Sequence, residues 1–313
     1  MVTLHRAARL LCATALALPV LGAQPTHDAG PVFGSGLDLV RLTVTVRDEK
    51  GNLIPNLEET AFKVYEDGRP QKIQVFARSV EPGHDEDLAL DLGLLFDTSE
   101  SMLDVLKLSQ EAAVRFLEAI PRARDLLTIF FDQDIRISRF DSENQQGLIQ
   151  RIFEAKSSGN TSLYDAIAVY LSRSQEGSGR KVLVVFTDGD DTSSQIGFGQ
   201  LRDLVRSSPV TIYPIAFAAG MPPGDVRTMQ ARAFLLGLAE TTGGRVFSPT
   251  VSKDLPDIYQ KLLEELESQY VIGFLSDNPR ADGRYRKLKV EVDAPRVRVS
   301  HRQGYTVPKE KKR

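Results

Sequence analysis

The 313-residue sequence contains a single cysteine, Cys12, which lies in an apolar run close to the N-terminus. Arg6 and Arg9 precede this run, and small residues ending at Ala23 follow it, an order typical of a secretory signal peptide. Removing residues 1–23 as a signal peptide would leave no cysteine, which excludes disulfides, a thiol nucleophile and cysteine metal ligands. We therefore expect an exported protein, periplasmic or extracellular.

Long hydrophobic runs and an excess of one charge are also missing. The N-terminal apolar run is well short of the ~20 residues that a membrane-spanning helix needs, and no later segment approaches that length. A lipid anchor on Cys12 is disfavoured because the bulky Leu11 precedes it. The formal net charge of -3 gives no electrostatic reason to expect nucleic acid or an anionic membrane as partner. We expect neither nucleic-acid binding nor membrane insertion.

Several catalytic motifs are absent from the sequence. It has no Gly-x-x-x-x-Gly-Lys phosphate loop, no His-Glu-x-x-His and no Gly-x-Ser-x-Gly before a helix. An aspartyl phosphatase is disfavoured because Ser99 stands where a second acid should follow Asp97. His27, His84 and His301 lie outside the signal peptide, and none is placed to act as a general base beside Ser99. We therefore expect a protein that is not an enzyme.

Two kinds of hydrophobic pattern alternate along the remaining chain. Residues 24–36 are rich in proline and glycine and predict a flexible leader. Strict alternation over 40–47 predicts a half-buried strand, and 62–66 and 73–76, around the Asp67-Gly68 turn, predict a strand pair. After a polar linker at 81–87, apolar runs alternate with helical periodicity. That alternation predicts an α/β fold with a doubly wound, mostly parallel sheet covered on both faces.

The elements of this central region can be assigned from periodicity. We expect strands over 88–96, 126–131, 135–140, 182–186, 210–217 and 245–247, and helices over 102–120, 145–154, 162–173, 198–207, 229–241 and 252–268. Alternating patterns typical of strands return over 270–275, 285–292 and 297–300.

The two β-rich segments each have too few strands for an independent core. We therefore expect residues 37–82 and 267–307 to form one small β-sandwich, into which the α/β domain of residues 88–266 is inserted. Residues 308–313 are expected to be a solvated basic tail. Two separate β appendages are the alternative.

Three polar motifs lie at positions where such a sheet binds ligands. Loops at the carboxyl ends of parallel strands carry such sites, and two of the motifs, Asp97-Thr98-Ser99-Glu100-Ser101 and Thr187-Asp188-Gly189, follow expected strands. The third, Gly159-Asn160-Thr161-Ser162, precedes an expected helix. We expect the oxygens of five side chains to converge there: Asp97, Ser99, Ser101, Thr161 and Asp188.

Two carboxylates and three hydroxyls suit a hard cation, Mg²⁺ or else Mn²⁺ or Ca²⁺, rather than Zn²⁺. The alternative for Ser99 or Ser101, and for Thr161 or Ser162, is a helix N-cap. The alternative for Asp188 is a simple turn before glycine. Asp190 and Asp191 are interpreted as solvated loop acids and are left out of the site.

Taken together, these motifs resemble the metal-ion-dependent adhesion site of von Willebrand factor type A domains and integrin inserted domains. The resemblance implies direct metal contact by Ser99 and Ser101, and contact through water by Asp97 and Asp188. It implies for Thr161 a role that depends on whether a ligand is bound.

The resemblance covers roughly residues 88–266. The flanking β segments are similar to a bacterial secreted VWFA-related group, on the motif formed by Tyr270, Gly273 and Phe274 with the later Gly304-Tyr305. A site of this family would bind a protein partner that supplies an Asp or Glu to the metal. A structural module with a loop-stabilising metal and a metal-dependent hydrolase are the alternative functions.

Overall fold

The computed structural model describes most of the chain beyond the N-terminal region. The described residues are 39–79, 89–120, 123, 125–140, 144–174, 179–217, 225–278, 280–307 and 309. The expected signal peptide (1–23), leader (24–36) and polar linker (81–87) lie outside them, as does the basic tail (308–313) apart from Lys309. None of the helices in these ranges has the length and apolar character needed to cross a membrane.

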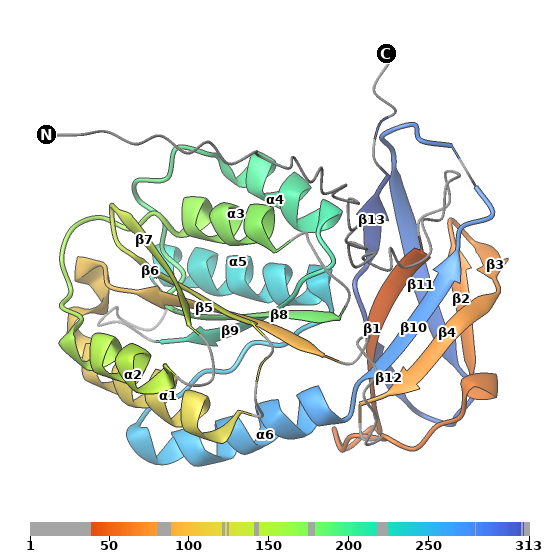
Figure 1. Ribbon diagram of the computed structural model, residues 1–313, viewed down its shortest axis with the longest axis horizontal. Coiled ribbons are helices and arrows are strands. Elements are labelled where there is room, and N and C mark those ends of the chain that lie inside the picture. Colours follow the sequence, from red (N-terminus) through yellow and green to blue (C-terminus); the bar gives the residue numbers. More distant parts are fainter. Residues whose placement is uncertain are drawn as a thin grey trace, which may run out of the picture. The chain divides into compact units, whose positions relative to one another are not determined.

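A five-stranded sheet forms the centre of the α/β part (Figure 1). Four strands are parallel and one edge strand is antiparallel, which confirms the expected mostly parallel sheet. The spatial order is β7 (Ile135–Phe140), β6 (Asp125–Phe131), β5 (Leu90–Asp97), β8 (Arg180–Thr187) and β9 (Thr211–Ala216).

Helices cover both faces of this sheet (Figure 1). One face carries α1 (Leu106–Ala119), α2 (Gln145–Glu154) and α6 (Leu255–Glu267), and the other carries α3 (Leu163–Arg173), α4 (Phe198–Ser207) and α5 (Val226–Thr242). Successive side chains of a strand point to opposite faces, so Leu94 and Phe96 of β5 enter the first core and Leu95 enters the second. The central strands β5 and β8 are therefore mostly apolar, because both of their faces are buried.

Gly93 of β5 provides the space into which Tyr170 of α3 packs. A Cβ atom at Gly93 would lie 2.1 Å from the Tyr170 ring, whose hydroxyl donates to the Val182 carbonyl at 3.2 Å. We expect Gly93→Ala to lower the free energy of unfolding by about 1–3 kcal/mol, because the ring must move and lose this bond. Urea denaturation measures the effect.

Gly199 offers a matched control for this substitution. It lies in the first turn of α4, and a Cβ atom there would have no neighbouring atom within 4 Å, so Gly199→Ala should be neutral or slightly stabilising. Equal stability of the Gly93 variant and the wild type would contradict the packing described for Tyr170.

The β-rich segments form two antiparallel four-stranded sheets (Figure 1). The first has the order β12 (Arg298–Ser300), β1 (Leu39–Arg47), β10 (Tyr270–Leu275) and β4 (Ile73–Arg78). The second has the order β13 (Gly304–Thr306), β11 (Tyr285–Val292), β2 (Phe62–Glu66) and β3 (Arg69–Gln71), with a 3-10 turn, η1 (Glu59–Ala61), before β2. Each sheet combines strands from before and after the α/β part, and one apolar cluster that includes Val44, Val64 and Ile272 draws on both.

The expected pairing of residues 62–66 with 73–76 is wrong. Strand β2 instead forms a hairpin with β3, while β4 pairs with β10 in the other sheet. Asp67 and Gly68 have φ angles of 47° and 81°, and two positive values are what a two-residue hairpin turn requires. Such a tight turn makes the partner strand begin at once, at Arg69. The short strand β13 was also not expected from the sequence.

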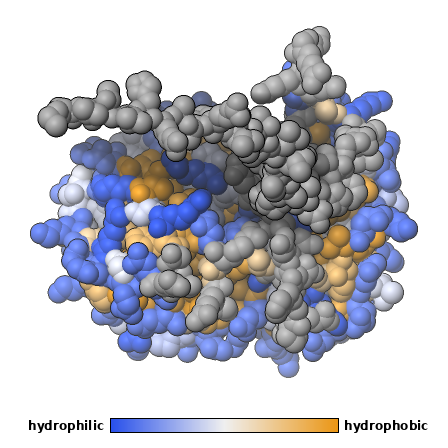
Figure 2. Space-filling view, viewed as in Figure 1, coloured by the Kyte–Doolittle hydropathy of each residue, from blue (hydrophilic) through white to orange (hydrophobic). Residues whose placement is uncertain are grey.

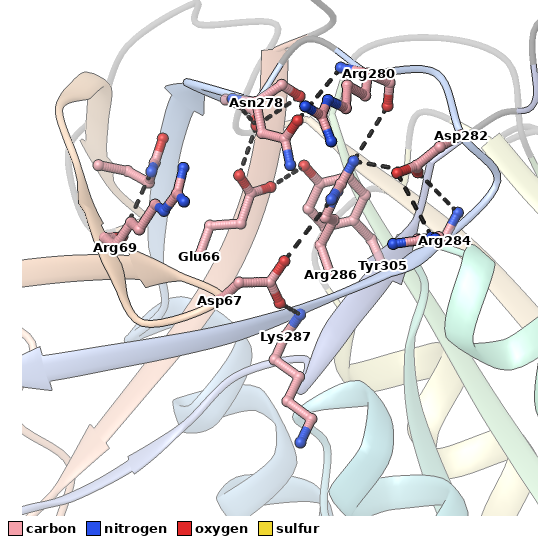
Figure 3. A network of polar contacts seen from close by, with 12 residues as sticks. Glu66, Asp67, Arg69, Asn278, Arg280, Asp282, Arg284, Arg286, Lys287 and Tyr305 are labelled. Atoms are coloured by element: carbon pink, nitrogen blue, oxygen red, sulfur yellow. Dashed lines mark hydrogen bonds and ion pairs between the residues drawn. The ribbon is translucent and has the colours of Figure 1, made fainter.

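A polar network closes one end of the two antiparallel sheets (Figure 3). The buried carboxylate of Glu66, at the end of β2, accepts hydrogen bonds from Ser276 Oγ at 2.6 Å and from the Tyr305 hydroxyl. The buried Arg286 of β11 donates to Asp282 at 3.1 Å and lies 3.8 Å from Asp67. Ser276 follows β10 of the first sheet, so the network links the ends of both sheets.

The surface seen in Figure 2 is mostly hydrophilic where it is coloured, and hydrophobic residues form separate patches between polar ones. Most large apolar side chains of the described residues are buried in the three clusters. The exposed exceptions include Leu103, Phe198 and Val226.

Candidate metal centre

Two of the three predicted motifs lie side by side at the carboxyl edge of the central sheet. Strands β5 and β8 are parallel neighbours, with Phe96 opposite Phe186. Asp97 therefore ends one strand beside Thr187 and Asp188 at the end of the next. This follows from the topology, because the carboxyl ends of neighbouring parallel strands share one edge of the sheet.

Asp97, Ser99 and Ser101 form one hydrogen-bonded cluster. Asp97 Oδ1 accepts from Ser99 N at 2.9 Å and from Ser99 Oγ at 2.6 Å, and Oδ2 accepts from Thr187 Oγ1 at 2.6 Å. The hydroxyls of Ser99 and Ser101 are 3.0 Å apart. Ser101 is the second residue of the 3-10 helix η3 (Glu100–Val105) that follows β5. The spacing of the motif thus brings its three side chains to one place.

Asp188 adds a second carboxylate that is only 9% exposed. Its Oδ1 accepts from Asp190 N at 3.0 Å, whereas its buried Oδ2 has no hydrogen-bond partner in the described part of the chain. Burial raises the pKa of Asp188, and the amide of Asp190 and the hydroxyl of Ser101 partly offset the rise. Burial, followed by the charge of Asp188, raises the pKa of Asp97 to about 7. Two buried carboxylates without a cation are electrostatically unfavourable.

Backbone hydrogen bonds tie the loop of Thr161 to the other two loops. The Ser158 amide donates to the Thr98 carbonyl at 2.9 Å, which joins this loop to the first motif. Thr161 N donates to Thr192 Oγ1 at 2.9 Å, which joins it to the loop after Asp188. No hydrogen bond links the Thr161 hydroxyl to the other four predicted ligands among the residues that the structure describes. The loop of Thr161 therefore lies against the other two loops, while the Thr161 side chain is not part of the hydrogen-bonded cluster.

The hydroxyls of Ser99 and Ser162 do not cap the helices that follow them. Ser99 precedes η3 and Ser162 precedes α3, and neither forms a side-chain capping bond. Asp188 does lie in a turn that requires glycine at the next position. Gly189 has φ +88°, and a Cβ atom there would lie 2.8 Å from Leu235. This turn positions the Asp188 carboxylate and does not compete with a role as ligand.

The interpretation of Asp191 as a solvated loop acid is wrong. Asp191 Oδ1 accepts from the amide of Tyr164, in the first turn of α3, at 3.0 Å and from Ser194 Oγ at 2.6 Å. Burial raises its pKa. The side chain thus caps α3 from a loop that is distant in sequence, which local patterns cannot indicate.

Two further residues hold the loops of the site through hydrogen bonds, and sequence patterns did not identify them. Thr187 donates to Asp97 and accepts from the Gly189 amide at 3.0 Å, so it joins the two acidic loops. Asp132, which follows β6, accepts from Arg136 at 2.6 Å. Arg136 also donates to the hydroxyl of Thr98 at 2.9 Å. The position of Asp132 directly after an apolar strand was a signal that could have identified it.

The donor set at this edge fits a hard divalent cation. Among the described residues, no group of three or more His, Cys, Asp and Glu side chains is placed to hold a metal; the candidate ligands here are two carboxylates and hydroxyls. The unpartnered Oδ2 of Asp188 and the adjacent hydroxyls are the kind of oxygen ligands that Mg²⁺ takes together with water. His301 cannot serve this edge, because its ring nitrogens contact the Val290 amide and the Arg302 carbonyl in the β-rich part.

Comparisons with solved structures give similarities of fold at low identity. BatB from Bacteroides thetaiotaomicron is 16% identical, covers 56% of this chain and 97% of its own, and has a TM-score of 0.43. An aerotolerance-related membrane protein from Bacteroides fragilis is 18% identical over 57% of this chain and 98% of its own, with a TM-score of 0.45. A von Willebrand factor type A protein from Catenulispora acidiphila is 10% identical over 88% and 74%, with a TM-score of 0.44. The comparison with curated proteins gave no match.

The family assignment rests on a different comparison. The family model of the von Willebrand factor type A domain matches residues 91–261, which is more than half of the chain and spans β5 to α6. Domains of this family are typically interaction modules without enzymatic activity and commonly bind other proteins. The chain therefore belongs to the von Willebrand factor type A domain family.

Proposed function

We propose that this chain is an exported protein-binding module that captures an Asp or Glu of a partner protein through a Mg²⁺-type ion. In this proposal Ser99 and Ser101 bind the ion directly, and Asp97 and Asp188 hold it through water. Thr161 joins the ligands according to whether the partner is bound. A metal with few charged protein ligands keeps its affinity for an outside carboxylate.

The observation that carries the proposal is the unpartnered Oδ2 of Asp188 beside the Asp97–Ser99–Ser101 cluster. A buried carboxylate oxygen without a donor is unfavourable. A cation between the two acidic loops removes that cost, and the hydroxyls of Ser99 and Ser101 are free of helix-capping roles.

Exposed apolar side chains near the same edge support a protein as the partner. Leu103 in η3 is 64% exposed, Phe198 at the start of α4 is 52% exposed, and Val226 at the start of α5 is 65% exposed. These elements follow β5, β8 and β9 and so begin at the carboxyl edge. A cleft of about 340 Å³ that is lined by Tyr164, Phe234 and other residues adjoins Gly189. Aromatic side chains are enriched in protein interfaces relative to the rest of a protein surface.

A displayed library of nine-residue peptides tests this function. The wild-type protein should select peptides that contain Asp or Glu in the presence of Mg²⁺, and EDTA should release them. Changing the selected acid to its amide should weaken binding by about tenfold or more, since a charged metal ligand is lost. Biolayer interferometry measures the difference.

Other outcomes distinguish the alternative functions. Mg²⁺ binding by calorimetry without any Mg²⁺-dependent peptide would favour a structural metal, and turnover of phosphoesters or peptides would favour a hydrolase. Mass spectrometry of the protein recovered from the cell envelope should find a mature N-terminus at Gln24; an intact Met1 would contradict export.

A further inference from the structure

A basic cleft lies on the side of the α/β part opposite to the candidate metal centre. It has a volume of about 560 Å³ and lies between the turn after β1 and helix α6. Arg180 begins β8, and its Nη1 donates to Gln269 Oε1, just after α6, at 3.0 Å. The end of α6 is therefore at the amino edge of the sheet, whereas the candidate metal centre is at the carboxyl edge.

Cationic side chains dominate the lining of this cleft. Among the described residues, one carboxylate lines it, that of Glu264, and its Oε1 accepts from Gln260 at 2.8 Å. The described part of the chain contributes four cations to the lining: Arg47, Lys50, Arg245 and Lys261. Lys50 and Lys261 are exposed, which places positive charge where a solute would enter.

The side chain of Arg47 is largely buried and is held by a buried acid. Its guanidinium forms an ion pair with Glu265 of α6, and the two side chains are 12% and 1% exposed. Tyr213 of β9 donates to the same carboxylate at 3.2 Å. The Nε of Arg47 is buried and has no hydrogen-bond partner among the described residues. An unsatisfied buried donor is unfavourable, so Glu265 alone does not satisfy this guanidinium group.

Arg245 supplies a second guanidinium group to the same cleft. It lies over the Phe247 ring, 4.5 Å from the centroid, and has no hydrogen bond or ion pair within the part of the chain that the structure describes. Burial lowers the pKa of Arg245; the charge of Glu265 opposes this effect and that of Arg47 adds to it. Glu265 thus faces two guanidinium groups and can balance only one.

We propose that this cleft binds a small oxyanion with at least two negative charges, carried by phosphate or carboxylate groups. Arg47 and Arg245 form its floor, because a guanidinium group can donate two N–H groups to a pair of carboxylate or phosphate oxygens. Lys50 and Lys261 attract the anion from solution. The site is independent of the metal and of the proposed capture of a partner.

Titration of the metal-free, full-length protein with inorganic phosphate and with citrate tests the proposal. At constant ionic strength set by NaCl, calorimetry should detect one saturable site for at least one of the two, and the stronger binder identifies the class of anion. Arg245→Gln should weaken binding about tenfold or more, as expected for loss of a charge-assisted hydrogen bond. Lys261→Gln, on the exposed surface of α6, should weaken it about threefold through loss of one nearby charge.

Lys107→Gln is the matched control, because Lys107 is an exposed residue of α1 that does not line the cleft. It should bind like the wild type. In NMR spectra, the Arg47 Nε–H signal should shift with saturation by the anion. The proposal is overturned if neither anion binds above the NaCl background, or if both Arg245→Gln and Lys261→Gln retain wild-type affinity.

Discussion

Replacing Asp188 with asparagine should weaken Mg²⁺ binding by about 10–100-fold, as is typical when a residue that orients a metal from its outer shell is lost. The same change should stabilise the metal-free protein by ~1 kcal/mol, because it removes one of two buried like charges. Asparagine keeps the side-chain oxygen that accepts from the Asp190 amide. Mg²⁺ affinity should thus fall while the stability of the metal-free protein rises, a combination that a simple loss of folding cannot produce.

Calorimetry with Mg²⁺ gives the affinity, and thermal unfolding in EDTA and in Mg²⁺ gives the stability. The wild type should gain stability from Mg²⁺, and the variant should gain little at the same concentration. Asp190→Asn is the matched control in the same turn, since among the described residues its Oδ1 accepts only from the Asp191 amide, at 3.1 Å. Wild-type Mg²⁺ affinity in Asp188→Asn would rule out the assigned centre.

Deleting residues 267–313 should convert the protein into an aggregating species. The deletion removes β10 and β12, which are the two neighbours of β1 in its sheet. It also removes β11, the central partner of β2. The apolar side chains of Leu42 and Val44, both at most 1% exposed in the full chain, would then face solvent. Unpaired strand edges with an exposed apolar face favour aggregation.

Size-exclusion chromatography with light scattering measures this outcome. Deletion of residues 310–313 alone is the control and should leave the elution and molar mass of the full chain unchanged, because it removes none of the strands in the described part of the chain. A soluble, cooperatively folding protein after deletion of 267–313 would mean that the N-terminal β segment needs no C-terminal partner.

Much of the α/β part is encoded locally. In β5 and β8, continuous apolar runs indicate strands buried on both faces, and helical spacing identified α2, α3 and α4. Those patterns are readable because a buried strand or helix must present apolar side chains with its own period. The Asp97 and Asp188 motifs could be placed at one edge for the same reason, since each follows such a strand.

The turn at Asp67-Gly68 illustrates what local patterns leave open. The sequence indicates a tight turn there, yet both 69–71 and 73–76 are compatible with a following strand. Only the sheet decides that β3 pairs with β2 and that β4 crosses to β10. Strand pairing depends on burial against residues far along the chain, so it is not contained in the period of either segment.

The sequence by itself determined the fold class, the apolar faces of the α/β part and the set of candidate ligands. Periodicity and motif spacing are properties of neighbouring residues. Tertiary structure alone decided which polar groups meet. It brought Thr187 to Asp97, Asp191 to the start of α3, and Arg47 to Glu265. These pairs join segments that are 27 or more residues apart, and a polar side chain carries no periodic signal that names its distant partner. Whether an acid is solvated, caps a helix or neutralises a buried cation is therefore fixed only when the layers pack.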